Sequence, residues 1–175
     1  MDYAITLYFD DATENNFSRI MEAVAAGGGN RYMVDTGIPP HITLALFSAA
    51  RVDGVRDELE RRHGEIGTGE VIWASLGAFV PRVLYAAPVL SEYLRAACVA
   101  ANELAEPFAE RMDGYYLPGQ WVPHMALAVQ LAPGELNAAF AAAAGLFTAV
   151  CGRAERLALA ECNPYREIAV WNLRA

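Results

Sequence analysis

Hydrophobic residues along this chain alternate between short β-like runs and longer helix-like segments. Residues 3–9 form an apolar, β-branched run that stops at Asp10-Asp11, as a buried strand does before a turn. A helical segment follows, and Gly27, Gly28 and Gly29 are expected to end it. The predicted strands are residues 3–9, 41–47, 71–80, 83–87, 124–131, 154–161 and 166–173, and the predicted helices are 13–26, 53–63, 89–111 and 134–150.

The order of strands and helices repeats. A shift of 83 residues aligns PPHITLALF with VPHMALAVQ, so that Pro40-His41 falls on Pro123-His124. The helix and hairpin after each motif then align as well, giving repeats at residues 41–87 and 124–173. Because a single βαββ unit cannot cover both faces of its sheet, we expect two copies to pack about a pseudo-twofold axis. No linker or low-complexity tract separates the halves, which favours one bilobal α+β domain over residues 1–175 with a central cleft.

Strand alternation predicts a cleft beside the two motifs. In the first motif His41, Thr43 and Ala45 should share one face, and in the second His124, Ala126 and Ala128 should do the same. Small residues behind each histidine would leave room for a ligand. Two imidazoles with ordinary pKa values near ~6.5 can act as general acid and general base, one protonated and one neutral.

A histidine at a strand start is more often a surface or core residue than a catalytic one. Here the repeat favours function, because two of only three histidines occupy equivalent positions. His63 closes a predicted helix, where an imidazole can interact with the last carbonyl groups, and we assign it no catalytic role.

PHITLALF and PHMALAVQL resemble the paired H-x-T/S motifs of the two-histidine (2H) phosphoesterases, and in particular the bacterial 2′-5′ RNA ligase-like proteins. The resemblance covers nearly the whole chain, including the YYLPGQWVPH approach to the second motif. It implies a phosphoesterase that needs no metal or cofactor and that acts on 2′,3′-cyclic phosphates or 2′-5′ linkages of nucleotides or RNA ends. It further implies that His41 and His124 are the acid and base, and that Thr43 donates to a phosphate oxygen.

The second motif departs from the family pattern, since Ala126 stands where a Thr or Ser is expected. Losing one donor to the phosphate oxygens can cost on the order of 10²-fold in rate. The preceding loop offers replacements that could also stack on a base, namely Tyr116 and Trp121, with Tyr115 and Gln120 beside them. The opposing interpretation is that these aromatic residues only pack the loop. Arg82, Arg166 and Tyr85 lie near the hairpins with no motif to point them inward.

The amino-acid composition limits the kinds of partner that the protein is expected to bind. With 55% apolar residues the chain can bury a substantial core. The cysteines are odd in number, and reduced thiols are therefore expected at Cys98, Cys151 and Cys162. The N-terminal sequence has no basic, signal-like region, so we expect a cytoplasmic monomer without membrane attachment. A net charge of -8, with every basic residue an arginine, argues against binding along a long nucleic acid.

Two other functions stay open. A phosphate- or nucleotide-binding module that has lost turnover is motivated by Ala126. A metal hydrolase has little support, because no His, Asp and Glu spacing supplies the three ligands that catalytic zinc usually needs.

Overall fold

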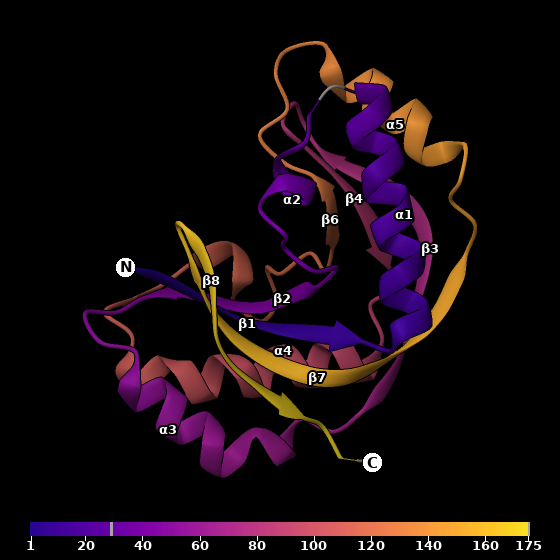
Figure 1. The fold of residues 1–175 in the computed structure, drawn as a ribbon. Helices are drawn as coiled ribbons and strands as arrows, with labels where there is room; N and C mark the ends of the chain where they lie inside the picture. Colours follow the sequence, from indigo (N-terminus) through magenta and orange to yellow (C-terminus); the bar gives the residue numbers. More distant parts are fainter. Residues whose placement is uncertain (29, 175) are drawn as a thin grey trace.

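The computed structural model of the protein describes residues 1–28 and 30–174. It is an α+β fold, as predicted, with helices packed against an antiparallel sheet (Figure 1). In chain order the elements are β1 Asp2–Phe9, α1 Asp11–Gly28, α2 Tyr32–Asp35, β2 Ile42–Ser48, α3 Asp53–Arg62, β3 Gly69–Phe79, β4 Val83–Pro88, α4 Glu92–Ala105, β5 Arg111–Met112, β6 Met125–Ala128, α5 Glu135–Ala144, β7 Val150–Cys162 and β8 Tyr165–Asn172. Short 3₁₀ turns lie at His63–Glu65, Glu106–Phe108 and Gly114–Tyr116.

The order of the strands places the two histidine motifs symmetrically. The sheet runs β5-β2-β1-β7-β3-β4-β6, and β8 pairs with β7. Reading outward from the centre, β7, β1 and β2 form one lobe, while β3, β4 and β6 form the other. Strands β2 and β6, which follow His41 and His124, therefore occupy matching positions. In this order β7 corresponds to β3, β1 to β4 and β2 to β6, about an axis between β7 and β3. That the chain arose by duplication, with repeats at residues 41–87 and 124–173, stays a prediction.

The helices cross between the lobes. Helix α1 follows β1 but packs against α5 and β6, whereas α4 follows β4 but packs against β2 (Figure 1). Helix α3 lies beside α4, so α3 and α4 cover the first lobe and α1 and α5 cover the second. Each lobe thus receives one covering helix from a β-α-β connection of the other lobe, which ties the two lobes together.

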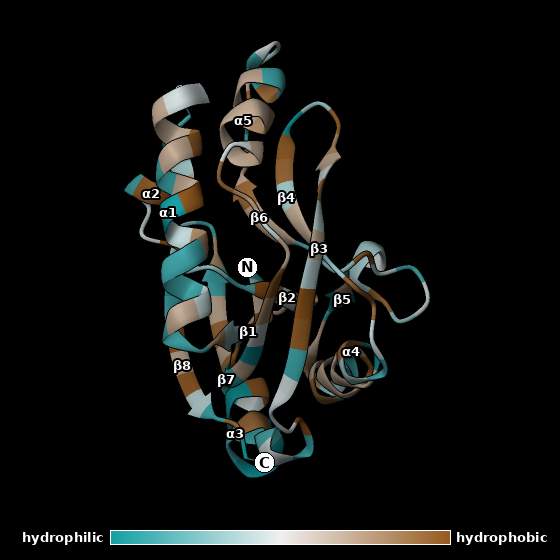
Figure 2. Cartoon of the chain, turned by 90° about the vertical axis from the view of Figure 1, so that its right-hand side faces the viewer, coloured by the Kyte–Doolittle hydropathy of each residue, from teal (hydrophilic) through white to brown (hydrophobic). Residues whose placement is uncertain are grey.

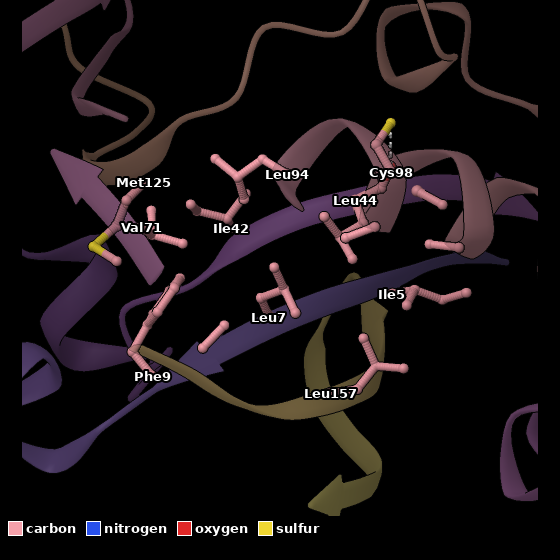
Figure 3. Packing of buried hydrophobic residues seen from close by; sticks show 14 of the residues in the cluster. Ile5, Leu7, Phe9, Ile42, Leu44, Val71, Leu94, Cys98, Met125 and Leu157 are labelled. Atoms are coloured by element: carbon pink, nitrogen blue, oxygen red, sulfur yellow. Dashed lines mark hydrogen bonds between the residues drawn. The ribbon is translucent and has the colours of Figure 1, made fainter. Parts of the chain in front are cut away.

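A continuous hydrophobic core lies between the sheet and these helices. Leu7 on β1, Ile42 and Leu44 on β2 and Leu94 on α4 are fully buried and lie between the two strands and the helix (Figure 3). Hydrophobic residues are concentrated along the strands, and the outer side of α1 is largely polar (Figure 2). Burying a large aliphatic side chain contributes roughly 1.5–3 kcal/mol, so this core is expected to hold the cleft walls rigid.

The glycine run at the end of α1 has a different role from the one predicted. Gly27 and Gly28 remain helical, because α1 contacts α5 there. A Cβ atom on Gly27 would lie 3.0 Å from Cβ of Ala142, and one on Gly28 would lie 3.3 Å from backbone and side-chain atoms of Ala139. These glycines allow close approach of two helices, and Gly29 lies outside the described residues.

The predicted helices at 89–111 and 134–150 are too long. Ser91 caps α4 by accepting a hydrogen bond from the Leu94 amide, and the helix ends just before Pro107. Strand β5 follows and pairs with the end of β2, while the second of these predicted helices stops at Ala144 and leads into β7. Helix α2 appears where a loop was expected.

Candidate functional site

The two motif histidines line the same cavity. His41 immediately precedes β2 and His124 immediately precedes β6, and these two strands contact each other between the lobes (Figure 1). Both imidazoles border a cavity of about 490 Å³, together with Thr43, Ala126 and Tyr116. The structure therefore brings together His41, His124, Thr43 and Tyr116, as the sequence predicted. We call this space the histidine cavity.

Each imidazole makes the same kind of hydrogen bond, to the backbone carbonyl two residues before it. The Nδ1 atom of His41 lies 2.8 Å from the carbonyl oxygen of Pro39, and Nδ1 of His124 lies 2.8 Å from that of Val122. A carbonyl oxygen only accepts, so Nδ1 carries the proton in both rings. In the neutral imidazoles Nε2 is then the atom that can accept a proton.

A β-bulge corrects the predicted strand faces. Between β1 and β2 the register shifts so that Ile5 pairs with Ala45 but Thr6 pairs with Thr43, which leaves Leu44 as the extra residue. Ala45 is therefore fully buried in the core rather than facing the cleft, and Leu46 lines the cavity instead.

The second half carries the same irregularity. Leu84 pairs with Ala128 and Tyr85 with Ala126, so Leu127 is unpaired and Val129, not Ala128, reaches the cavity. The bulges fall at equivalent places in both motifs. The prediction from alternating strand faces missed both bulges, because it assumes that each residue of one strand pairs with one residue of the neighbouring strand.

Trp121 does not line the cavity, contrary to our prediction that it contacts substrate. Its side chain is almost fully buried, and Nε1 donates to the carbonyl oxygen of Thr43 at 3.0 Å. It therefore ties the loop before the second motif to the strand of the first. We assign it a positioning role, since it fixes the backbone that carries the Thr43 hydroxyl.

Aromatic rings surround His124. The ring centroids of Phe79, Tyr85 and Tyr116 lie 4.9, 5.6 and 6.2 Å from that of the imidazole. A Cβ atom on Gly77 would fall 2.5 Å from the Tyr85 ring, so glycine makes room for this packing. Burial, with added effects of Asp113 and Cys162, raises the pKa of Tyr116 to about 12, which keeps its hydroxyl a donor at neutral pH.

Arg82 is a cavity residue that sequence reasoning left unassigned. It lies in the turn between β3 and β4, lines the histidine cavity, and forms no ion pair with any other described residue. None of the described residues that line this cavity is Asp or Glu. In a chain with a net charge of -8, the space beside the two histidines is thus free of carboxylates and suited to an anion.

The floor of the cavity comes partly from β1. It is lined there by Ala4, Thr6 and Tyr8. The Tyr8 hydroxyl lies 2.7 Å from the hydroxyl of Tyr165, which is the first residue of β8. The alternation of Thr6 and Tyr8 with core residues of β1 could have indicated this second face. Among the described residues, Thr6 Oγ1 is one of the buried polar atoms without a hydrogen-bond partner.

We expect Thr6→Val to stabilise the protein. The change keeps the shape but removes an unsatisfied hydroxyl, which should add about 1 kcal/mol to the free energy of unfolding and ~2–4 °C to Tm. Thermal denaturation checks this effect, and a Tm at or below that of the wild type would contradict it.

Burial lowers the pKa of both catalytic candidates below the ordinary histidine value. For His41 the hydrogen bond to the Pro39 carbonyl opposes this effect, while the nearby His124 adds to it. For His124 the hydrogen bond to the Val122 carbonyl is the opposing effect. Both free imidazoles are consequently neutral at neutral pH, whereas acid-base catalysis by a pair of histidines needs one of them protonated.

The pH profile of kcat/KM is therefore expected to peak on the acid side of ~6.5 and to fall as pH rises toward 8. The general acid loses its proton as pH rises through its lowered pKa, and the general base is blocked below its own. The kcat profile should lie at higher pH, because a bound phosphate anion favours imidazolium. Initial rates at constant ionic strength test this, and a kcat/KM maximum above pH 7 would contradict it.

Neither a metal-binding cluster nor a membrane-spanning helix occurs in the described part of the chain. Within residues 1–28 and 30–174, no group of three or more His, Cys, Asp or Glu side chains is placed to hold a metal ion. No helix among those residues is both long and apolar enough to cross a bilayer.

Comparison with known proteins agrees with the geometry. The model of the 2′-5′ RNA ligase superfamily matches residues 5–163. Similar solved structures include TT0787 of Thermus thermophilus, with a TM-score of 0.63, 19% identity and coverage of 100% of this chain and 99% of that one. E. coli LigT complexed with 3′-AMP has a TM-score of 0.61, 12% identity and coverage of 99% and 98%.

A third similar structure is Kluyveromyces marxianus Usb1 with uridine monophosphate, at a TM-score of 0.51, 14% identity and coverage of 99% and 98%. No sequence among the curated proteins matches significantly. The structural neighbours share the fold, and the family model covers most of the chain. The chain belongs to the 2′-5′ RNA ligase superfamily, within the two-histidine phosphoesterases.

Proposed function

We propose that this protein is a metal-independent phosphoesterase that hydrolyses, or reversibly forms, 2′,3′-cyclic phosphates or 2′-5′ linkages of nucleotides or RNA ends. The observation that carries the proposal is the histidine cavity itself. It combines His41, His124 and Arg82, and no carboxylate is among its described lining residues. Such a cavity in an acidic chain favours a small anionic ligand over a long polyanion.

The two histidines would share the proton transfers. In hydrolysis of a cyclic phosphate, Nε2 of one imidazole accepts a proton from water as its oxygen attacks phosphorus. The bond from phosphorus to one ribose oxygen breaks, and the other imidazole, protonated beforehand, donates to that oxygen. Because both rings are anchored alike, each suits either role, and the ester bond that is cleaved would decide which one acts as base.

Thr43 would stabilise the charge that develops on the non-bridging phosphate oxygens. Its hydroxyl lies on the cavity side of β2, two residues from His41. The equivalent Ala126 has no such group, so the phosphate would be held unevenly, mainly from the first lobe and by Arg82. A preorganised donor of this kind typically contributes on the order of 10²–10³ in kcat.

Hydrolysis of 2′,3′-cyclic mononucleotides tests the proposal. We expect turnover that persists in excess EDTA, because all the groups invoked belong to the protein. Complete loss of activity in EDTA, with recovery on adding a divalent metal, would refute the metal-independent mechanism. Detection of one nucleoside monophosphate isomer among the products would identify which ribose oxygen leaves.

A second candidate function is a nucleotide- or phosphate-binding module with little turnover, and the observation that favours it is Ala126. Isothermal titration with 3′-nucleotides would report binding, and a panel of cyclic and 2′-5′ substrates would report turnover. Binding without product supports this alternative. A gain of cyclic phosphate hydrolysis in Ala126→Thr would instead point to an enzyme weakened by the missing hydroxyl.

A further inference from the structure

The amide side chain of Asn102 is buried on the side of α4 that faces β2. It is 6% exposed, and Nδ2 lies 3.2 Å from the carbonyl oxygen of Leu44, 3.0 Å from that of Tyr116 and 2.9 Å from that of Cys98. The opposite orientation of the amide would place Oδ1 against three carbonyl oxygens, which only accept. The partners therefore fix the orientation of Asn102, and its two N–H groups are shared among these carbonyls.

These contacts support a part of β2 that has no strand on its outer edge among the described residues. Strand β5 pairs only with the last two residues of β2, and the carbonyl oxygen of Leu46 accepts from a backbone amide. The carbonyl oxygen of Leu44 accepts instead from Asn102 and, at 3.5 Å, from the thiol of Cys98 (Figure 3). Side chains of α4 therefore replace a strand partner at the residue that follows Thr43.

The same amide joins two sides of the histidine cavity. On one side is the backbone of Leu44, directly after Thr43, whose side chain lines the cavity. On the other side is the backbone of Tyr116, whose ring centroid lies 6.2 Å from that of His124. One side chain thus fixes the spacing between the strand that carries the expected phosphate donor and the loop beside a catalytic candidate. A misplacement of about 1 Å can cost on the order of 10²-fold in rate, so this spacing matters.

The oxygen atom of this amide gains nothing from its burial. Oδ1 of Asn102 is buried without a hydrogen-bond partner among the described residues. An unsatisfied buried acceptor costs free energy, which an apolar side chain of the same shape would avoid. The amide is therefore better explained by the two backbone segments that Nδ2 holds than by a contribution to stability.

The second half has no such amide among the described residues. Helix α1 packs against β6 as α4 packs against β2, and Leu127 is the extra residue of the bulge in that half. The buried side chains of α1 are Thr13, Phe17, Ile20, Met21, Val24 and Ala25. None of them carries an amide. The buried amide therefore accompanies the strand that has the Thr43 hydroxyl, and not the strand that has Ala126.

We propose that Asn102 is a positioning residue, which holds the backbone beside Thr43 so that the Thr43 hydroxyl meets the phosphate oxygens in a fixed orientation. This inference rests on the proposed function. Asn102 itself does not border the histidine cavity, so it acts through the strand and the loop that it binds. A donor that is aligned beforehand needs no rearrangement as charge develops on the phosphate oxygens. Without the amide, the carbonyls of Leu44 and Tyr116 keep only the weak thiol donor of Cys98.

Asn102→Leu removes the amide and keeps the branched shape of the side chain. We expect kcat for a 2′,3′-cyclic mononucleotide to fall about 10-fold while KM changes less than about 2-fold, because the misplaced hydroxyl acts mainly in the transition state. Asn102→Ala, which adds no bulk, should show the same separation of kcat from KM. Leu104→Ala is the control for lost stability, since Leu104 is also buried on α4 and does not border the histidine cavity. It should lower Tm and leave kcat as in the wild type.

A double-mutant cycle with Thr43→Ala gives a readout that a general loss of structure would not give. If Asn102 acts through the Thr43 hydroxyl, Asn102→Leu should slow the Thr43→Ala variant less than about 2-fold, although it slows the wild type about 10-fold. Equal losses in the two backgrounds, or a wild-type kcat in both Asn102 variants, would overturn the proposal. Unfolding of both Asn102 variants at the assay temperature would assign this residue to stability alone and would overturn it as well.

The wild type separates this inference from the proposed function. Turnover of the cyclic nucleotide, with equal losses in the two backgrounds, would overturn the inference and leave the proposed function standing. If the wild type binds inorganic phosphate without turnover, the proposed hydrolysis fails, and the same cycle is measured on Kd for phosphate. Weaker binding in Asn102→Leu that disappears in the Thr43→Ala background would then support the inference, and equal weakening would overturn it. Neither turnover nor phosphate binding would overturn both.

Discussion

Replacing His41 or His124 with alanine is expected to lower kcat/KM for a 2′,3′-cyclic nucleotide about 10³-fold. Each change removes one proton transfer, and a positioned general acid or base typically contributes 10²–10⁴-fold. Both imidazoles are only half-buried, and each makes one hydrogen bond to its own backbone, so the fold should persist. Steady-state kinetics with circular dichroism of each variant measure the two effects.

His63 provides the matched control. It is the remaining histidine of the chain, its Nδ1 donates to the Leu59 carbonyl, and its ring stacks on Trp171 at a centroid distance of 6.0 Å, away from the histidine cavity. We expect His63→Ala to keep wild-type kcat/KM. The double variant His41→Ala/His124→Ala should lose little more than either single variant, because residues that act as a unit are not additive. Activity that survives both single changes would refute the acid-base assignment.

Thr43→Ala is expected to have the next largest effect, a fall of about 10²-fold in kcat. Its hydroxyl is the donor expected to strengthen its bond to the phosphate as charge builds up on the oxygens. The hydrogen bond from Trp121 reaches the backbone carbonyl of Thr43 and survives the change. Thr43→Ser should recover most of the rate, since it keeps the hydroxyl.

Thr148→Ala serves as the control for that series. Thr148 is exposed in the connection between α5 and β7 and does not border the histidine cavity, so the rate should not change. Stopped reactions at saturating substrate give kcat directly. If Thr43→Ser were as slow as Thr43→Ala, packing rather than the hydroxyl would explain the loss.

The sequence was enough to predict that His41, Thr43 and His124 meet in one cavity. His41 and His124 stand out because a repeat places them at matching strand starts, and a repeated strand order constrains the topology strongly. The face assigned to Ala45 was wrong, because the bulge at Leu44 depends on pairing with β1, a strand remote in the chain. Local alternation carries no information about such a pairing.

The positions of residues in turns, and of residues held by contacts with distant parts of the chain, were harder to predict. Arg82 lines the cavity from the turn between β3 and β4, and no local pattern in the sequence specifies that position. Trp121 was expected to contact substrate, yet it packs inward and binds the Thr43 carbonyl. Stacking platforms and loop anchors use the same aromatic residues, so only the tertiary contact distinguishes them.

Nuclear magnetic resonance of nitrogen-15-labelled histidine tests most directly whether His41 and His124 face one phosphate group. The chain has three histidines, so each imidazole can be followed separately during titration with a 3′-nucleotide. We predict that the Nε2 signals of His41 and His124 both move toward the imidazolium position, while those of His63 stay fixed. Saturating binding that moves the signals of only one cavity histidine, or of neither, would contradict the account.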